Sequence, residues 1–225
     1  MNDIYFFGGG KADGSSSDKN LLGGKGANLA EMTHLGIPVP PGFTISTGIC
    51  RYYMEKGEFP KSLEAQVQKF LHEVENIMGQ KFGDVDNPLL VSIRSGARQS
   101  MPGMMETVLN VGLTSKTIPG LIHKSSDERF AYDAYRRLIT MYADVVMEKA
   151  SGMEIQGGKG IRGKLDEILE AMKLREGVKM DGDLSATHLK ELCDKYKSTI
   201  KETFNNEFPD DANTQLWGAI TAVFK

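Results

Sequence analysis

The first part of the chain mixes short apolar runs with apolar residues at helical spacing. The apolar run 4–7, which three glycines follow, predicts a strand that enters a flexible glycine-rich loop. Apolar residues at the spacing of a helix face predict helices over 25–35 and 62–79. The proline-rich segment between these helices cannot be helical, and it predicts an edge strand at 43–45.

Two more strands are expected before residue 114. The continuous apolar stretch 87–93 predicts a buried strand, and 108–113 predicts the next one. The sequence SGARQSMPGMMET between them gives about a dozen residues without an expected element. Loops of that length inside a compact domain usually have a function.

The pattern becomes helical after these strands. Ser125 and Glu128 predict a capping box at the start of a long helix that ends at Gly152. Phe130 and Met141 belong to the apolar stripe that we expect this helix to bury.

Three segments complete the chain. Helices are expected over 165–174 and 189–204, and the last run, TQLWGAITAVFK, is also helical but lacks a stop signal, which is typical of a chain that continues. We therefore expect a mixed part over 1–114, a helical insertion over 115–208 and a truncated return helix over 209–225.

Charge and composition narrow the class of partner. The chain has 27 basic and 30 acidic residues and a net charge of −3, so no overall field attracts nucleic acid or an anionic membrane. Cys50 and Cys193 form no paired motif, which favours a reducing compartment over a disulfide framework. Neither a signal peptide nor a run of about 18 apolar residues is found, so we expect a cytoplasmic location.

The sequence LLGGKGANLAEM has a lysine where a helix is expected to start. A cation in the first turn of a helix is unfavourable by about 0.3–1 kcal/mol. Gly24 and its neighbours allow a ligand to approach the backbone, and Lys25 adds a charge to the N–H groups of the helix start. This combination favours a phosphate site. The alternative is a simple turn with Lys25 in solvent.

The second candidate site begins at the end of the strand predicted over 87–93. Arg94 can present its planar guanidinium to a phosphate there, although a surface ion pair is the alternative. In the loop that follows, Gly103 can expose backbone N–H groups and Thr107 offers a hydroxyl. Met105 and the nearby methionines can cover a reacting centre, or can fill a core instead.

Two other patterns are not expected to form sites. Residues 158–163 spell G-x-G-x-x-G, but a helix precedes them where a dinucleotide-binding fingerprint requires a strand, so an interhelical loop is expected. The four histidines lie in separate elements, so no metal site is expected in the chain.

Several motifs together resemble a known family. The stretches FFGGGKADG, NLLGGKGANLAEM, GIPVPPGFTIST and VSIRSGARQSMPGMMETVLNVGL are similar to the N-terminal nucleotide-binding region of the pyruvate, phosphate dikinase family, across essentially the whole chain. The related phosphoenolpyruvate synthase family resembles GGK and PVPPGF, but its later loop typically runs through SFAGQQ. The resemblance implies an α+β fold, the first lobe of an ATP-grasp nucleotide-binding domain with a helical insertion.

The resemblance also implies an activity. The family converts ATP, phosphate and pyruvate to AMP, pyrophosphate and phosphoenolpyruvate through a phosphohistidine on a separate domain. Lys25, Gly24 and Arg94 are similar to its ligands of the ATP phosphates, and the loop through Gly103, Met105 and Thr107 resembles its lid over the transferring group.

Other parts of the family's machinery are expected outside these 225 residues. They are the second lobe with acidic Mg²⁺ ligands, the phosphohistidine domain and the pyruvate-binding barrel, and the full-length enzyme is expected to be a homodimer. The chain alone is therefore not expected to turn over. The alternatives are a synthase-like ATP-grasp fragment and a non-catalytic interaction module.

Overall fold

The computed structural model describes residues 3–96, 107–152 and 159–225. The chain forms two compact units. Unit 1 takes in Met1–Lys81, Arg94–Glu106 and Phe224–Lys225, and unit 2 takes in Phe82–Ile93 and Thr107–Val223. Helices and small sheets occur together, which confirms an α+β fold. The division at residues 114 and 208 stays a prediction.

A three-stranded antiparallel sheet forms the centre of unit 1. Its strands are β1 (Ile4–Gly8), β2 (Lys11–Ala12) and β3 (Gly42–Ile45), in the order β2-β1-β3. Ile4 pairs with Ile45, so β3 lies at the edge of the sheet beside the central strand β1. This arrangement confirms the strand predicted over 4–7 and the edge strand predicted at 43–45.

The glycine-rich segment after β1 is a tight hairpin, and the prediction of a flexible loop there is wrong. Gly8 pairs with Lys11, so only Gly9 and Gly10 form the turn. Their φ values of 57° and 80° lie in the left-handed region, which the favoured two-residue hairpin turn requires at both positions. Asp13 then accepts a hydrogen bond from the Phe6 N–H at 2.9 Å, which fixes the return strand.

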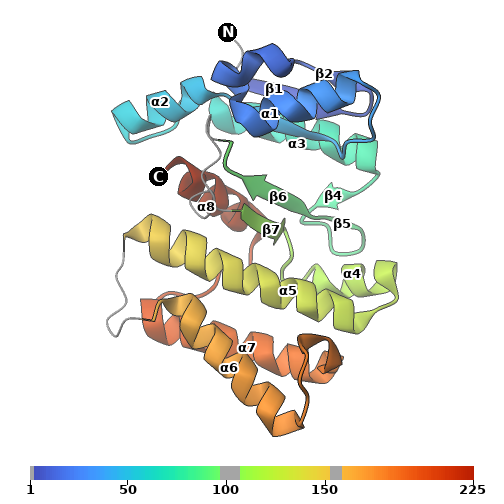
Figure 1. The fold of residues 1–225 in the computed structure, drawn as a ribbon, viewed down its shortest axis with the longest axis vertical. Coiled ribbons are helices and arrows are strands. Elements are labelled where there is room, and N and C mark those ends of the chain that lie inside the picture. Colours follow the sequence, from blue (N-terminus) through green and yellow to red (C-terminus); the bar gives the residue numbers. More distant parts are fainter. Residues whose placement is uncertain (1–2, 97–106, 153–158) are drawn as a thin grey trace. The chain divides into compact units, whose positions relative to one another are not determined.

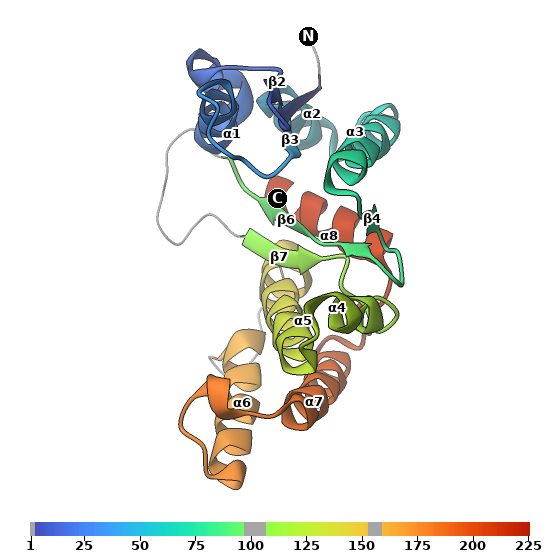
Figure 2. The ribbon, with the colours of Figure 1, turned by 90° about the vertical axis from the view of Figure 1, so that its right-hand side faces the viewer.

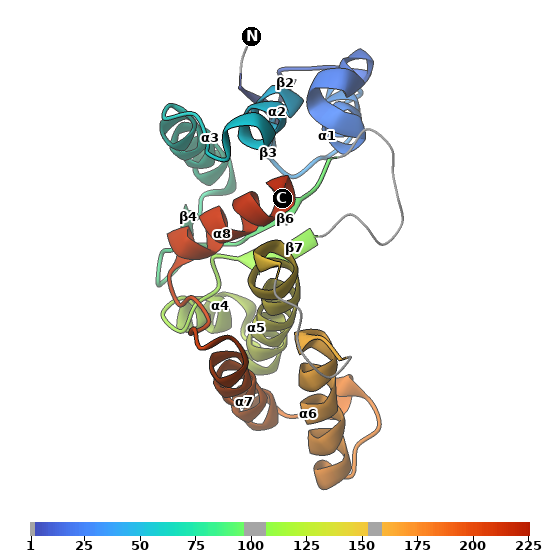
Figure 3. The same cartoon turned by 90° about the vertical axis from the view of Figure 1, so that its left-hand side faces the viewer.

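Helices cover both faces of this sheet. Figures 2 and 3 show α1 (Lys19–His34) and α3 (Leu63–Met78) on opposite sides of it. The short helix η1 (Ser16–Asp18) precedes α1, and α2 (Thr47–Lys56) follows β3. The helix predicted over 62–79 is confirmed as α3, with Ser62 before it and Gly79, at a φ of 63°, after it.

The strand predicted over 87–93 is in fact two short strands. Pro88–Leu89 (β5) pairs with Lys81–Phe82 (β4), and Val91–Arg94 (β6) pairs with Thr107–Val111 (β7). Only β5 is buried throughout, because residues in β6 alternate between half-buried and exposed. The predicted continuous burial is therefore wrong for the second half of the stretch.

Helices make up most of unit 2. They are α4 (Ile118–Ser125), α5 (Glu128–Tyr142), α6 (Ile161–Glu176), α7 (Ala186–Phe204) and α8 (Ala212–Phe224), with the short helix η4 (Asp181–Asp183) between α6 and α7. The chain continues from α5 through the π-helical turn η2 (Ala143–Glu148) and the 3₁₀ turn η3 (Lys149–Ser151). Figure 1 shows α5 between β7 and the pair formed by α6 and α7.

The predicted capping box at the start of α5 is wrong. Ser125 is the last residue of α4, and Ser126 ends that helix with a φ of 52°. Asp127 caps α5 instead, because its carboxylate accepts a hydrogen bond from the Phe130 N–H at 2.8 Å. Phe130 itself is 51% exposed, so it does not belong to the core as predicted.

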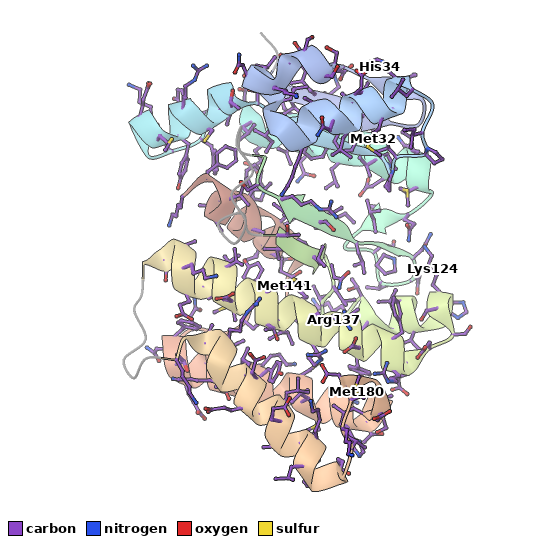
Figure 4. The ribbon with its side chains drawn as sticks, in the orientation of Figure 1. Met32, His34, Lys124, Arg137, Met141 and Met180 are labelled. Carbon is purple, nitrogen blue, oxygen red and sulfur yellow. The ribbon has the colours of Figure 1, made fainter. Side chains whose placement is uncertain are left out.

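One side of α5 carries both a polar and an apolar side chain. Figure 4 labels Arg137 and Met141, which lie four residues apart on the same side of α5. Met141 is only half-buried, whereas Leu138 is fully buried as the spacing predicts, together with Tyr135 and Ile139.

In the part of the chain that the structure describes, no helix is both long and apolar enough to cross a bilayer.

Buried ionisable groups in unit 2 lead to a prediction for alkaline pH. Burial raises the pKa of Tyr142 and Tyr196 from 10.0, and that of the Cys193 thiol from 9.0, in each case to about 12. The unfolded chain releases these protons at a lower pH than the folded chain. The free energy of unfolding should therefore be unaffected by these groups below about pH 9 and should fall as the pH rises to about 12.

Urea unfolding at a series of pH values across this range measures the effect. The Tyr196→Phe variant is the control, since phenylalanine fills the same space but does not ionise, and its unfolding free energy should fall less steeply with pH. An identical pH dependence in both proteins would contradict the assignment to this tyrosine.

Candidate functional site

Helix α1 is interrupted at Gly23. This residue has φ 68° and ψ 171°, which is not helical, and helical backbone resumes after it. The helix predicted to begin at Lys25 therefore begins earlier, at Lys19, but Lys25 still lies in the first turn after the break. N–H groups at such a helix start lack carbonyl partners in the preceding turn and have a partial positive charge.

The break in α1 contacts the chain that follows β6. A Cβ atom at position 23 would overlap the carbonyl oxygen of Gly96 and would lie 2.7 Å from its carbonyl carbon. The two backbones therefore touch where both residues lack a side chain. Both segments belong to unit 1.

This contact brings two predicted site segments together. Gly24 and Lys25 directly follow Gly23, and Arg94 lies two residues before Gly96. Two residues of chain span at most about 7 Å, so the Lys25 and Arg94 backbones both lie near the contact. Lys25 is half-buried and Arg94 is exposed, and within the described residues neither forms an ion pair.

Contacts with the sheet hold the start of α1 in place. A Cβ atom on Gly26 would lie 2.7 Å from the Thr44 hydroxyl oxygen, so only glycine lets α1 approach β3 this closely. The Thr47 hydroxyl donates a hydrogen bond of 2.7 Å to the Asn20 carbonyl oxygen at the other side of the break. Sequence reasoning missed the supporting role of Gly26, for which the only signal is the third glycine of the GGKG run.

The remaining predicted site residues lie elsewhere or outside the described chain. Thr107 is half-buried and opens β7, the strand that pairs with β6. Gly103 and Met105 lie outside the described residues. The roles of these three residues stay predictions.

The start of α6, in the G-x-G-x-x-G stretch, already has an anionic partner. A carboxylate oxygen of Glu148 accepts a hydrogen bond of 2.6 Å from the Ile161 N–H, and a Cβ atom on Gly160 would lie 2.7 Å from the other one. The helical turn η3 precedes this stretch, but Ile161, Arg162 and Gly163 already form the first turn of α6, so the expected interhelical loop does not extend to the end of the stretch.

Neither a groove nor a metal-binding cluster coincides with the predicted site residues in the described part of the chain. A shallow groove of about 610 Å³ lies between α6 and α7, and it contains none of the predicted site residues. Its polar lining includes Arg175 and Glu191, which pair with each other at 2.7 Å. Over residues 3–96, 107–152 and 159–225, no cluster of histidine, cysteine and acidic side chains could hold a metal ion.

Comparison with known sequences identifies the family. The profile described as "Pyruvate phosphate dikinase, AMP/ATP-binding domain" matches residues 19–69 and 54–212. The chain belongs to this family. Membership agrees with the resemblance noted from the GGK and MPGMMET motifs.

Named relatives of the family are similar over nearly all of the chain. A pyruvate, phosphate dikinase of Rhizobium meliloti (strain 1021) is 49% identical over 222 residues, which are 98% of this chain and 24% of the relative. That of Clostridium symbiosum is 47% identical over 215 residues, 95% of this chain and 23% of the relative. A chloroplastic form from Arabidopsis thaliana is 48% identical over 223 residues, 98% and 22% respectively. The chain thus spans about a quarter of the length of these relatives.

Proposed function

We propose that this chain binds the phosphates of ATP as the first part of the ATP-grasp domain of a pyruvate, phosphate dikinase. The whole enzyme would convert ATP, phosphate and pyruvate to AMP, pyrophosphate and phosphoenolpyruvate through a phosphohistidine outside this chain. The observation that supports this most is the backbone contact of Gly23 with Gly96, because it places Lys25 and Arg94 in one region of unit 1.

Each proposed site residue has a distinct role. Lys25 supplies a mobile point charge and Arg94 a planar fork that can bind two phosphate oxygens, while Gly24 offers a backbone N–H at the helix start. Thr107 would contribute a hydroxyl, and Gly103 and Met105 would cover the transferring group.

The remaining machinery is proposed to lie outside this chain. Phosphoryl transfer depends on charge neutralisation by Mg²⁺, and we expect the acidic Mg²⁺ ligands on a second lobe. A phosphohistidine domain, a pyruvate-binding barrel and a second subunit would complete the enzyme. The chain by itself is therefore expected to bind ATP without turnover.

Titration of the chain with ATP, followed by amide NMR, tests the proposal. Half of a nucleotide cleft is expected to bind ATP with a Kd of about 1 mM, equivalent to about −4 kcal/mol. The largest shifts are expected in residues 22–26 and 94–96, and adenosine without phosphates should not produce them. Shifts confined to the groove between α6 and α7 would contradict the proposal.

A non-catalytic interaction module is the second candidate. The observation that favours it is the exposure of Leu174 and Met180, at 84% and 67%, beside the α6–α7 connection. Such a module would use this apolar surface and would show no response to ATP at residues 22–26. The same titration therefore separates the two functions.

A further inference from the structure

The Gly23–Gly96 contact does not depend equally on its two glycines. Gly23 has a left-handed φ of 68°, and any side chain on it would collide with the backbone of Gly96. A Cβ atom on Gly96 would lie 3.5 Å from the Leu22 carbonyl oxygen, which is an ordinary contact, and Gly96 has no left-handed φ. The contact therefore requires glycine at position 23 and tolerates alanine at position 96.

One side of the contact is held rigidly by the sheet. The close approach of Gly26 to Thr44 and the hydrogen bond from Thr47 to Asn20 hold α1 on both sides of the break. Gly96 packs against this fixed point, so the backbone of Arg94, two residues away, is fixed relative to Lys25. The fold thus holds the backbones of two cationic residues near the same contact.

Two cationic residues whose backbones are held in this way would favour ligands with a longer phosphate chain. Two positive side chains repel each other, and a single phosphate group neutralises them less well than a chain of phosphates that can contact both. Because the fold has already ordered the two backbones, the ligand does not lose binding energy in bringing them together.

We propose that Gly23 is a positioning residue. Through its contact with Gly96 it fixes the spacing of Lys25 and Arg94, so that the site prefers nucleotides with a polyphosphate chain to nucleoside monophosphates. This inference rests on the proposed function, since it assumes that both cations bind the same ligand.

The ratio of ATP affinity to AMP affinity measures this role. In the unmodified chain, ATP should bind at least about tenfold more tightly than AMP, and Gly23→Ala should lower this ratio to near one. Gly96→Ala should keep the ratio. Gly36→Ala is the matched control for the backbone strain, because Gly36 has a φ of 74° but nothing within 4 Å of a Cβ atom. It should lower the melting temperature without changing the ratio.

The outcomes distinguish this inference from the proposed function. If the unmodified chain does not bind ATP, the proposed function fails and the inference with it. If Gly23→Ala is folded and keeps the ratio of the unmodified chain, the inference alone is overturned.

If Gly23→Ala does not fold, NMR on the unmodified chain decides. A nuclear Overhauser contact between the α-protons of Gly23 and residue 96, together with an unchanged ratio in Gly96→Ala, supports the inference. Absence of that contact, or a lost preference for ATP in folded Gly96→Ala, overturns it.

Discussion

Replacing Arg94 by alanine is expected to weaken ATP binding by the chain about 10- to 100-fold, because charge-assisted hydrogen bonds are worth about 1.5–3 kcal/mol. Lys25→Ala should have a similar effect, since both side chains extend from the region of the Gly23–Gly96 contact. In an NMR titration the shifts of residues 22–26 should no longer reach saturation. Arg94→Lys keeps the charge but loses the planar fork, so it should recover only part of the affinity.

Charge-matched variants on the same unit provide the control. Arg51 and Lys56 are exposed residues of α2 in unit 1. Their alanine variants remove the same charges at positions outside the proposed site, so ATP should bind to them as to the unmodified chain. Equal losses in Arg51→Ala and Arg94→Ala would indicate a general effect of net charge and would contradict the site.

Replacing Gln215 by leucine is expected to lower the free energy of unfolding by about 3–5 kcal/mol. The Gln215 side chain is fully buried in α8, and it donates hydrogen bonds to the carbonyl oxygens of Leu113 and Pro209 at 3.1 and 2.9 Å. It also accepts one from the Gly112 N–H at 3.0 Å. Leucine removes the partner of two buried backbone groups directly after β7, the Gly112 N–H and the Leu113 carbonyl, and of the partly buried Pro209 carbonyl. Urea or thermal unfolding measures the loss.

The exposed neighbour Asn213 offers a matched comparison. Asn213→Leu also replaces an amide by an apolar side chain in α8, but at the surface, where a change within about 0.5 kcal/mol is expected. If the two variants had similar stability, the buried hydrogen bonds of Gln215 would not stabilise unit 2 as we infer.

Much of the helical part of the fold could be predicted from apolar spacing. Helices α3, α6 and α7 each bury one stripe, and their existence is clear from the sequence, although α6 and α7 begin some residues earlier than predicted. Helix α2 was missed because Ile49 is its only buried residue within the described chain, so its pattern has no apolar stripe. The start of α5 was misplaced because Ser125 and Asp127 both fit a cap, and only tertiary packing decides between them.

The site was predictable in its residue types but not in its geometry. A lysine after two glycines indicated a phosphate site, and an arginine at a strand end indicated a second cation. No local pattern relates Gly23 to Gly96, because the contact joins backbones far apart in the sequence. The break within α1 was missed for the same reason. Glycine at position 23 permits the break, but the segment that lies against it is not evident from the sequence.

The π-helical turn η2 carries two carboxylates that contact α6. The number of residues in this turn therefore affects how α5 and α6 are spaced. A π turn holds one residue more than an α turn. Asp144 in this turn pairs with Arg162 of α6 at 3.1 Å, while Glu148 binds the first N–H of the same helix. Deleting one residue between Asp144 and Glu148 would leave room only for an α turn and would change the separation of these two carboxylates along the helix, on which both contacts with α6 depend. Substitutions in η2 should therefore be accepted more readily than indels, and this helix junction is a poor place to graft or trim sequence.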